Sequence, residues 1–208
     1  KIAYREAIRK PVTIESKYKK QSGGHGQYGH VKIEFEPYDG DELMFCEKVF
    51  GGAVPKNFFP AVEKGLQEAA EHGSIGGFQV VRLKATLIDG SYHPVDSSEM
   101  AFKTAASMAF KDCMKEAQPY LLEPVDSLKI LLPDDKQGDV MSVLSKRRGS
   151  VLGMNSVGGG MTELLAEAPE AELGDFALTL RQITQGLGEF TSEFARYDML
   201  PPGTEIKS

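Results

Sequence analysis

The sequence predicts an α+β protein of two domains, because strand and helix patterns alternate and the series restarts near Pro124. Its 208 residues, 41% hydrophobic and 26% charged, are enough for a core in each domain and argue against a disordered chain. We predict a first domain over 1–123, a second over 124–200 and an exposed tail over 201–208.

The first domain opens with a predicted hairpin. β-Branched and charged residues from Ala3 to Lys20 indicate one or two strands, broken at Pro11, which cannot donate a ladder hydrogen bond. Apolar and polar side chains alternate over His30–Pro37, as in a strand with one buried face. The glycine-dense segment Ser22–Gly29 joins the two.

Two further strands, Phe45–Phe50 and Val81–Leu87, flank a predicted helix. The helix begins near Pro60, and we expect Gly73 to end it in a left-handed conformation.

A polar loop, Asp89–Val95, leads into a second helix of the first domain. We predict Asp96 as its N-cap, because Glu99 follows three residues later in capping-box position. An apolar stripe continues this helix to Gln118.

The second domain repeats a strand and helix pattern in the order βαββαβ. The predicted elements are Val125–Leu132, Asp139–Arg148, Ser150–Val157, Met161–Ala168, Leu173–Ile183 and Phe190–Tyr197. Gly149 is the expected stop of the first helix, and Gly158–Gly160 the turn between the middle strands. Two βαβ halves of this size match the ferredoxin-like arrangement.

Charge is distributed unevenly along the chain. The net charge is -6, from 24 basic and 30 acidic side chains. Residues 1–32 hold eight basic and two acidic side chains, a balance of +6, so the remainder sums to -12. This basic arm favours contact with phosphate, whereas a solvated strand face is the alternative reading of the same charges.

The apolar runs and the cysteines of the sequence indicate where the protein is located. No apolar run is long enough for a transmembrane helix, and Cys46 and Cys113 are too few and too far apart for a disulfide framework. We therefore expect a reducing, cytoplasmic location. The chain begins at Lys1, inside a predicted strand, so we expect it to be cut from a longer polypeptide.

The glycine segment satisfies two nucleotide-binding patterns, Gly24-x-Gly26-x-x-Gly29 and its extension to Val31. A dinucleotide site needs a helix after the glycines, and here a strand follows. A kinase needs His-Arg-Asp and Asp-Phe-Gly motifs, and neither occurs, nor does a phosphate loop. We expect no catalysis and no cofactor in this chain, with a nucleotide-dependent enzyme as the alternative.

No metal site or serine nucleophile is predicted. The histidines lack the i, i+4 spacing of a zinc-binding helix and have no Cys-x-x-Cys partner. They are His25, His30, His72 and His93. Ser97 and Ser98 lie outside any Gly-x-Ser-x-Gly elbow, and helix capping accounts for both.

Two polar loops, 21–30 and 89–96, are suited to RNA. Glycine lets a backbone approach a phosphate closely, and amide, hydroxyl and ring groups offer hydrogen bonds and stacking faces. The side chains with these properties are Ser22, His25, Gln27, Tyr28, Ser91, Tyr92 and His93, and Lys17, Lys19 and Lys20 precede them. A stand-alone RNA-binding module and a mobile hairpin tip without a partner are the alternatives.

Several runs resemble a known family. Those similar to the fourth domain of bacterial elongation factor G are Tyr4–Arg9, Lys20–Val31 and Gly90–Glu99. Those similar to its fifth domain are Leu121–Pro124, Gly138–Val140 and Lys146–Gly149. The resemblance covers essentially the whole chain.

The resemblance implies a fold and a role. It implies a ribosomal protein S5 domain 2-like domain followed by a ferredoxin-like domain. The parent would be a GTPase whose catalytic domain, with GTP and Mg, lies upstream, and which promotes translocation of tRNA and mRNA. Its partners would be the ribosome, the ribosomal RNA of both subunits, and tRNA and mRNA in the decoding region. We expect a monomer without membrane contact. A paralogue acting in ribosome recycling, rescue or ribosome protection is the alternative.

The resemblance also implies site residues, carried over position by position. Those expected to contact RNA are Lys19, Lys20, Gln21, Ser22, Gly23, Gly24, His25, Gly26, Gln27, Tyr28, Gly29, Ser91, Tyr92, His93, Arg147 and Arg148. Two positions depart from the family pattern. His25 replaces the usual arginine and Pro94 the usual aspartate, which removes a permanent charge and stiffens the second loop.

Overall fold

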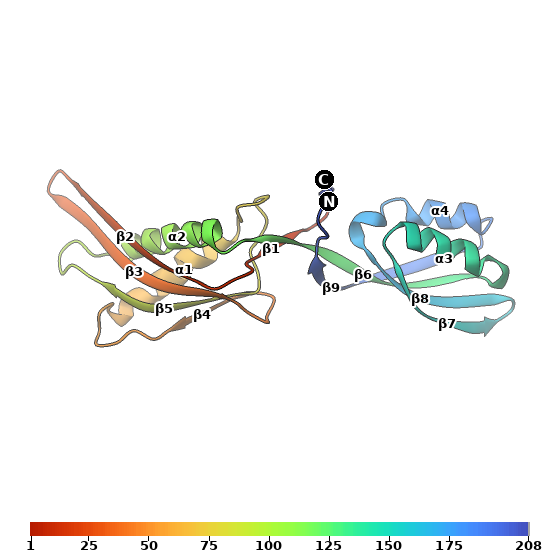
Figure 1. Cartoon of the computed structure of the whole chain (residues 1–208), viewed down its shortest axis with the longest axis horizontal. Coiled ribbons are helices and arrows are strands. Elements are labelled where there is room, and N and C mark those ends of the chain that lie inside the picture. Colours follow the sequence, from red (N-terminus) through yellow and green to blue (C-terminus); the bar gives the residue numbers. More distant parts are fainter. Residues whose placement is uncertain (208) are drawn as a thin grey trace. The chain divides into compact units, whose positions relative to one another are not determined.

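The computed structural model describes residues 1–207 and all of their side chains except that of Ser22. The chain forms two compact units, one of Arg5–Leu121 and one of Lys1–Tyr4 with the chain from Leu122 onward (Figure 1). Both contain helices and β-sheet, so the predicted α+β class is confirmed. We predicted residues 1–4 in the first domain, but they pack in the second unit, where the Tyr197 hydroxyl donates to the Ala3 carbonyl at 2.8 Å.

The Arg5–Leu121 unit contains a four-stranded sheet in the order β2-β3-β5-β4. The strands of this unit, with the short strand that precedes them, are β1 (Arg5–Ala7), β2 (Val12–Ser22), β3 (His25–Pro37), β4 (Leu43–Glu47) and β5 (Leu83–Ser91). β2 and β3 form the predicted hairpin. Its two turn residues, Gly23 and Gly24, have φ of 60° and 94°, as a type I′ turn requires. β5 runs antiparallel to β3 and parallel to β4.

Two helices, α1 (Phe59–Ala70) and α2 (Glu99–Glu116), pack against each other, and α2 lies on β2 and β3. A 3₁₀ turn, η1 (Lys56–Phe58), precedes α1. Inward side chains of sheet and helices share one core, which includes Ile14, Val31, Ile33, Phe35, Val62, Leu66, Leu83, Leu87, Phe102, Ala106 and Phe110. Alternation along β3 and helical spacing along α2 therefore bury the faces that the sequence predicts.

The predicted end of α1 is wrong. The helix ends at Ala70, and Gly73 does not take a positive φ. Gly73 is required for a different reason: a Cβ there would overlap the Glu6 carboxylate. This carboxylate is fully buried and accepts main-chain N–H bonds from Ile75, Gly76 and Phe78 at 2.9 to 3.0 Å. A long-range contact between β1 and the loop after α1 thus explains the glycine.

The predicted start of α2 is also wrong. Ser98, not Asp96, is the N-cap, and its Oγ accepts the Ala101 N–H at 3.1 Å. Glu99 becomes the first helical residue, so no capping box forms. Asp96 instead belongs to the loop before the helix, where its main chain has another partner.

The second unit contains a ferredoxin-like sheet. Its elements are β6 (Tyr120–Pro133), η2 (Asp134–Lys136), α3 (Gln137–Lys146), β7 (Ser150–Gly158), β8 (Met161–Pro169), η3 (Glu170–Glu172), α4 (Phe176–Ile183) and β9 (Glu189–Met199). β6 pairs with β8 and β9, and β8 pairs with β7, all antiparallel. The order β9-β6-β8-β7 is the one that the βαββαβ pattern predicts.

The core of the second unit is formed by the sheet and both helices. Its members include Leu128, Ile130, Leu132, Val140, Leu144, Leu164, Phe176 and Leu180. The residue that ends α3 in a left-handed conformation is Arg148, with φ of 58°, rather than Gly149. Gly149 donates its N–H to the Leu144 carbonyl at 2.7 Å, which closes the end of the helix.

Within residues 1–207, no helix is long and apolar enough to cross a membrane. Over the same residues, no three His, Cys, Asp or Glu side chains are grouped to hold a metal ion.

The two cysteines differ in their surroundings, and this difference predicts their reactivity. Cys113 is fully buried in α2, and burial, aided by Glu116, raises the pKa of its thiol to about 12. Because the thiolate is the reactive form, iodoacetamide at pH 8 should label only the partly exposed Cys46 of the folded chain. Mass spectrometry of the peptides checks this. Labelling of Cys113 should require urea, and equal labelling without urea would contradict the buried position.

Candidate nucleic-acid interface

The two polar loops lie side by side at one end of the four-stranded sheet (Figure 1). β3 and β5 pair up to His30 and Ser91, where the second loop begins. The Tyr28 N–H donates to the Asp96 carbonyl at 2.9 Å, and the Ser97 hydroxyl donates to the Tyr28 carbonyl at 2.9 Å. Both main-chain groups of Tyr28 therefore bind the loop 92–97. We call the end of the hairpin together with this loop the tip.

Side-chain hydrogen bonds reinforce this arrangement below the tip. The Ser91 Oγ lies 2.6 Å from the Tyr28 Oη and 2.7 Å from the His30 Nδ1, and the His30 Nε2 lies 3.4 Å from the Glu15 carboxylate. Ser91 carries one proton, so it donates to one neighbour and accepts from the other. In one arrangement Tyr28 donates to Ser91, and Ser91 donates to the His30 Nδ1. The proton of the His30 ring is then on Nε2 and faces the Glu15 carboxylate. The Ser91 hydroxyl is thereby used to position Tyr28.

Two glycines of the Gly-x-Gly-x-x-Gly pattern allow close contact between the hairpin and the segment after β5. A Cβ on Gly26 would lie 2.7 Å from the Asp96 Cγ. A Cβ on Gly29 would lie 2.6 Å from the Ala101 carbonyl carbon and 2.9 Å from the Phe102 nitrogen. Gly29 is buried against the first turn of α2, so it serves packing rather than contact with a ligand. The pattern that resembles a nucleotide loop is explained by the fold of the tip.

Main-chain N–H groups of the loop fix the tautomer of the His93 ring. Its Nδ1 accepts the N–H groups of Val95 and Asp96 at 3.2 and 3.0 Å, so this nitrogen carries no proton. The Asp96 carboxylate lies 3.7 Å from the same nitrogen, too far for a hydrogen bond. The neutral ring therefore carries its proton on Nε2. The His93 side chain is 49% exposed and offers a hydrogen-bond donor at the tip.

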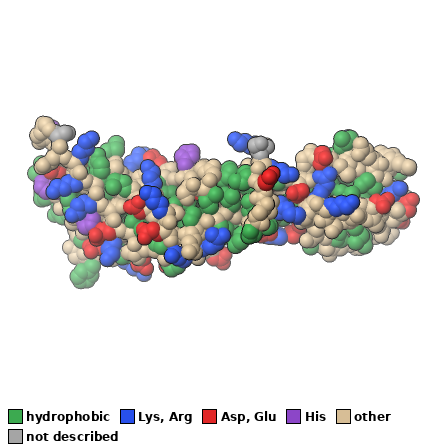
Figure 2. All heavy atoms as spheres, turned by 45° about the horizontal axis from the view of Figure 1, so that its top comes forward, with side chains coloured by type: hydrophobic (Ala, Val, Ile, Leu, Met, Phe, Trp, Pro, Cys, Tyr) green, Lys and Arg blue, Asp and Glu red, His purple; other side chains and the backbone are tan. Residues whose placement is uncertain are grey.

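The outer surface of the tip is polar and partly basic. Exposed residues of the hairpin are Lys17, Lys19, Lys20, Gln21, Gly23, Gly24, His25 and Gln27. Lys and Arg side chains, with histidines, gather at this end of the unit (Figure 2). The Lys17 Nζ lies 5.8 Å from the centroid of the Tyr28 ring. A hollow of about 300 Å³ between Gln21, His25 and Asp96 contains one carboxylate, which disfavours a phosphate within it.

The basic side chains of residues 1–32 lie in different parts of the fold. The Arg9 guanidinium donates to the carbonyls of Gln118 and Pro119 at 3.3 and 3.2 Å and lies 5.0 Å from the Tyr120 ring centroid. It caps the segment after α2 and does not belong to the tip. The lysines of β2 are the part of the arm that lies beside the two loops.

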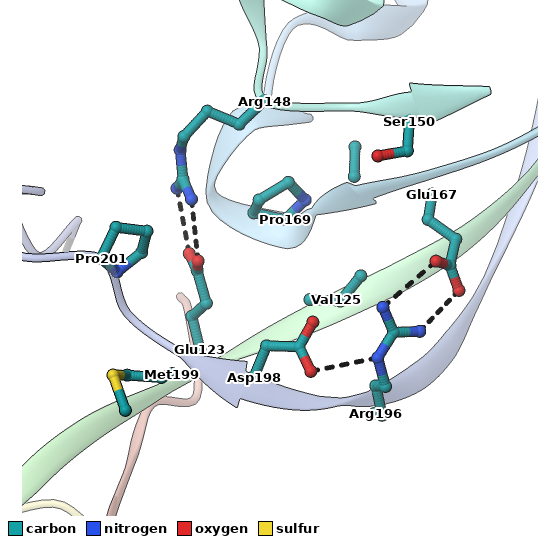
Figure 3. Close-up of a pocket in the computed structure, with 11 residues that line it drawn as sticks. Glu123, Val125, Arg148, Ser150, Glu167, Pro169, Arg196, Asp198, Met199 and Pro201 are labelled. Carbon is teal, nitrogen blue, oxygen red and sulfur yellow. Dashed lines mark hydrogen bonds and ion pairs between the residues drawn. The ribbon is translucent and has the colours of Figure 1, made fainter.

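Arg147 and Arg148, which we also expected to contact RNA, lie in the second unit and are bound within it. Arg147 donates to the Asp175 carboxylate at 2.6 Å and to the Glu172 carbonyl at 2.7 Å, and the bond to Asp175 lowers the pKa of that carboxyl. Arg148 makes two bonds to the buried Glu123 carboxylate, at 2.8 and 3.0 Å (Figure 3). The pKa of Arg148 is raised, chiefly by this hydrogen bond. The geometry gives both arginines a structural role.

The hollow beside Arg148 is lined by charges that pair with one another (Figure 3). The Arg196 guanidinium donates to Glu167 at 2.6 and 3.2 Å and to Asp198 at 3.0 Å. The hydrogen bond from Arg196 lowers the pKa of Glu167. Both arginines here, Arg148 and Arg196, already hold carboxylates, which disfavours a further anion in this hollow of about 270 Å³.

One loop at the same end of the sheet was missed by the sequence reasoning. We predicted a strand through Phe50, but β4 ends at Glu47, and Phe50 lies in the loop that follows. Gly51 and Gly52, directly after an apolar residue, were the available signal, because both take positive φ in a turn.

The comparisons with known proteins identify the family. The family model described as "Elongation factor G, domain IV" matches residues 1–118, and that described as "Elongation factor G C-terminus" matches residues 120–205. The two units are thus C-terminal domains of a translation factor. The chain belongs to the elongation factor G family.

Two relatives cover nearly the whole chain. It is 48% identical over 208 residues to an elongation factor G-like protein of Thermotoga maritima, of which it covers 30%. A crystal structure of a protein from Thermus thermophilus superposes with a TM-score of 0.91 at 46% identity, over 97% of this chain and 30% of that one. The chain therefore spans about a third of the length of these relatives.

The close packing at Gly29 predicts that Gly29→Ala destabilises the unit. The new Cβ would meet the main chain of α2, which cannot move alone, so we expect a loss of about 1–3 kcal/mol in the free energy of unfolding. Urea denaturation measures this loss. The matched control is Gly138→Ala in α3, where no atom lies within 4 Å of the new Cβ. Equal stability of the two variants would contradict the contact between β3 and α2.

The ion pair of Arg148 predicts a loss of stability in Arg148→Met. Removing the guanidinium leaves the Glu123 carboxylate, whose side chain is 4% exposed, without its partner, which should cost about 3 kcal/mol. The control is Lys146→Met, on an exposed side chain two residues earlier. Urea denaturation of both variants is the measurement. If Arg148→Met unfolds at the same urea concentration as Lys146→Met, the pair is not structural.

Proposed function

We propose that this chain is the ribosome-contacting C-terminal part of a translational GTPase of the elongation factor G type, which promotes translocation of tRNA and mRNA. In this proposal the tip enters the decoding region of the small subunit. The observation that carries it is the pairing of the hairpin with loop 92–97 through Tyr28, which fixes two polar loops on one end of the sheet.

The tip works by shape and hydrogen bonding rather than by covalent chemistry. A rigid hairpin that extends from the sheet can occupy the space vacated by a tRNA and oppose its return. The lysines Lys17, Lys19 and Lys20 supply positive potential for phosphates. The exposed Gln27 amide and the Nε2–H of His93 supply directional hydrogen bonds to RNA.

The remaining parts of the proposal concern the whole protein. GTP and Mg are bound, and GTP is hydrolysed, in a domain outside this chain, whose own contribution is not catalytic. The partners are the ribosomal RNA of both subunits, tRNA and mRNA, and the protein acts as a monomer in the cytoplasm. The second unit contributes contacts of its own, although the internal ion pairs of Arg147 and Arg148 make other residues the better candidates for them.

A chimera tests the proposal. This chain replaces the matching segment of the Thermotoga maritima elongation factor G-like protein, and translocation is followed by stopped-flow fluorescence of labelled mRNA. We expect the unsubstituted chimera to translocate. His93→Ala and Gln27→Ala should each slow translocation roughly tenfold, equivalent to about 1.4 kcal/mol of lost stabilisation, with GTP hydrolysis on the ribosome maintained.

The matched control is Lys111→Ala, an exposed position on α2. It should leave both rates unchanged. Normal translocation by the His93 and Gln27 variants would refute the role of the tip.

A further inference from the structure

Phe50 is exposed to an unusual extent for an aromatic residue. Its side chain is 92% exposed, and the next most exposed large apolar side chain among the described residues is Val95, at 82%, in loop 92–97 of the tip. Burying a phenylalanine usually contributes about 1.5–3 kcal/mol to folding, so the fold gains almost nothing from this ring. Single exposed apolar side chains are common on protein surfaces, so the position of this ring and the charges beside it decide whether it contacts a partner.

The loop that carries Phe50 is held rigidly. The Phe50 carbonyl accepts the Ala53 N–H at 3.4 Å, and Gly51 and Gly52 between them have φ of 64° and 69°. Positive φ at both central positions defines a type I′ turn. Val49 packs against the core on one side of the turn, and Val54 is buried on the other, at 1% exposure. The ring is therefore presented to solvent on a fixed support.

This turn lies at the same end of the sheet as the tip. β4 and β5 run parallel, so the chains that leave Glu47 and Ser91 leave at the same edge (Figure 1). β5 continues four residues beyond Leu87, the partner of Glu47, to Ser91, so the root of the Phe50 loop lies about 13 Å along the sheet from the start of loop 92–97. A Cβ on Gly90 would lie 2.7 Å from the Val54 Cγ2, so the chain just after the turn packs against the end of β5.

We propose that Phe50 extends the RNA-contacting surface beyond the tip to the β4 edge of the sheet and stacks on an unpaired nucleobase of RNA. The inference rests on the proposed function, because it takes the partner of the tip to be RNA. Two exposed lysines, Lys48 and Lys56, flank the turn and suit the phosphates on either side of a stacked base. The nearby Glu47 carboxylate accepts the Val49 N–H at 3.0 Å, and the two lysines favour a nucleic acid over an apolar protein surface.

A fluorescence experiment tests the stacking directly. The chain contains no tryptophan, so Phe50→Trp introduces a single fluorophore in this turn. The probes are a synthetic RNA stem-loop with an unpaired purine loop and a fully paired duplex of the same stem. We expect the stem-loop to quench the fluorescence of the Phe50→Trp variant saturably, and the duplex to quench it little. The control is Ile75→Trp, in the loop after α1, which should show neither effect.

Affinity measurements separate stacking from other apolar contact. Stacking on one base contributes enough that Phe50→Ala should weaken binding of the stem-loop roughly 5- to 100-fold. Phe50→Leu should behave like Phe50→Ala, because it retains an apolar side chain but loses the ring, whereas Phe50→Tyr should bind normally. The urea midpoint of all three should match that of the parent chain, because the ring is exposed.

The outcomes distinguish this inference from the function on which it rests. If His93→Ala or Lys20→Ala weakens RNA binding while Phe50→Ala does not, the tip contacts RNA and the stacking role is overturned. If the unsubstituted chain binds neither the stem-loop nor ribosomes, the proposed function fails first. If isolated ribosomal proteins shift the fluorescence of Phe50→Trp and RNA does not, the ring docks on protein and the inference is overturned.

Discussion

The tip depends on the main-chain hydrogen bonds of Tyr28. Its N–H and carbonyl are both bound by loop 92–97, through the Asp96 carbonyl and the Ser97 hydroxyl. Without these bonds the hairpin would extend beyond the sheet with one free edge, and its orientation would be set by strand pairing alone. Glycines at 26 and 29 make the approach sterically feasible. One residue thus converts two separate loops into a single surface.

Arginine has a different role in each part of the chain, although the sequence gives little indication of the difference. Arg9 caps carbonyl groups after α2, whereas Arg148 neutralises the buried Glu123. In both cases the guanidinium completes the hydrogen bonding of its own unit. Exposed lysines of β2 carry the positive charge that faces outward at the tip. Lysine is well suited to this role because its charge stays hydrated on a flexible stem, while the planar guanidinium fits fixed bidentate partners.

Most elements could be predicted from local pattern. Alternation in His30–Pro37 and the glycine turn gave the hairpin, and the βαββαβ order gave the ferredoxin-like sheet, because these signals lie within a few residues of one another. The predictions were wrong where a residue distant in the sequence determines the local structure. Gly73 lies against the Glu6 carboxylate and does not cap a helix. Ser98 is the N-cap of α2, whereas Asp96 lies in the loop before it, where the Asp96 carbonyl accepts the Tyr28 N–H.

The sequence by itself determined the periodicity, the turns and hence the order of strands, since these depend on neighbouring residues. The composition of the two polar loops also predicted that they contact RNA. Only the tertiary structure decided which polar groups remain free. It uses the Ser91 hydroxyl to hold Tyr28, leaves the His93 Nε2–H exposed and turns Phe50 to solvent on the loop after β4. These outcomes follow from contacts between strands far apart in the chain, which local pattern cannot encode.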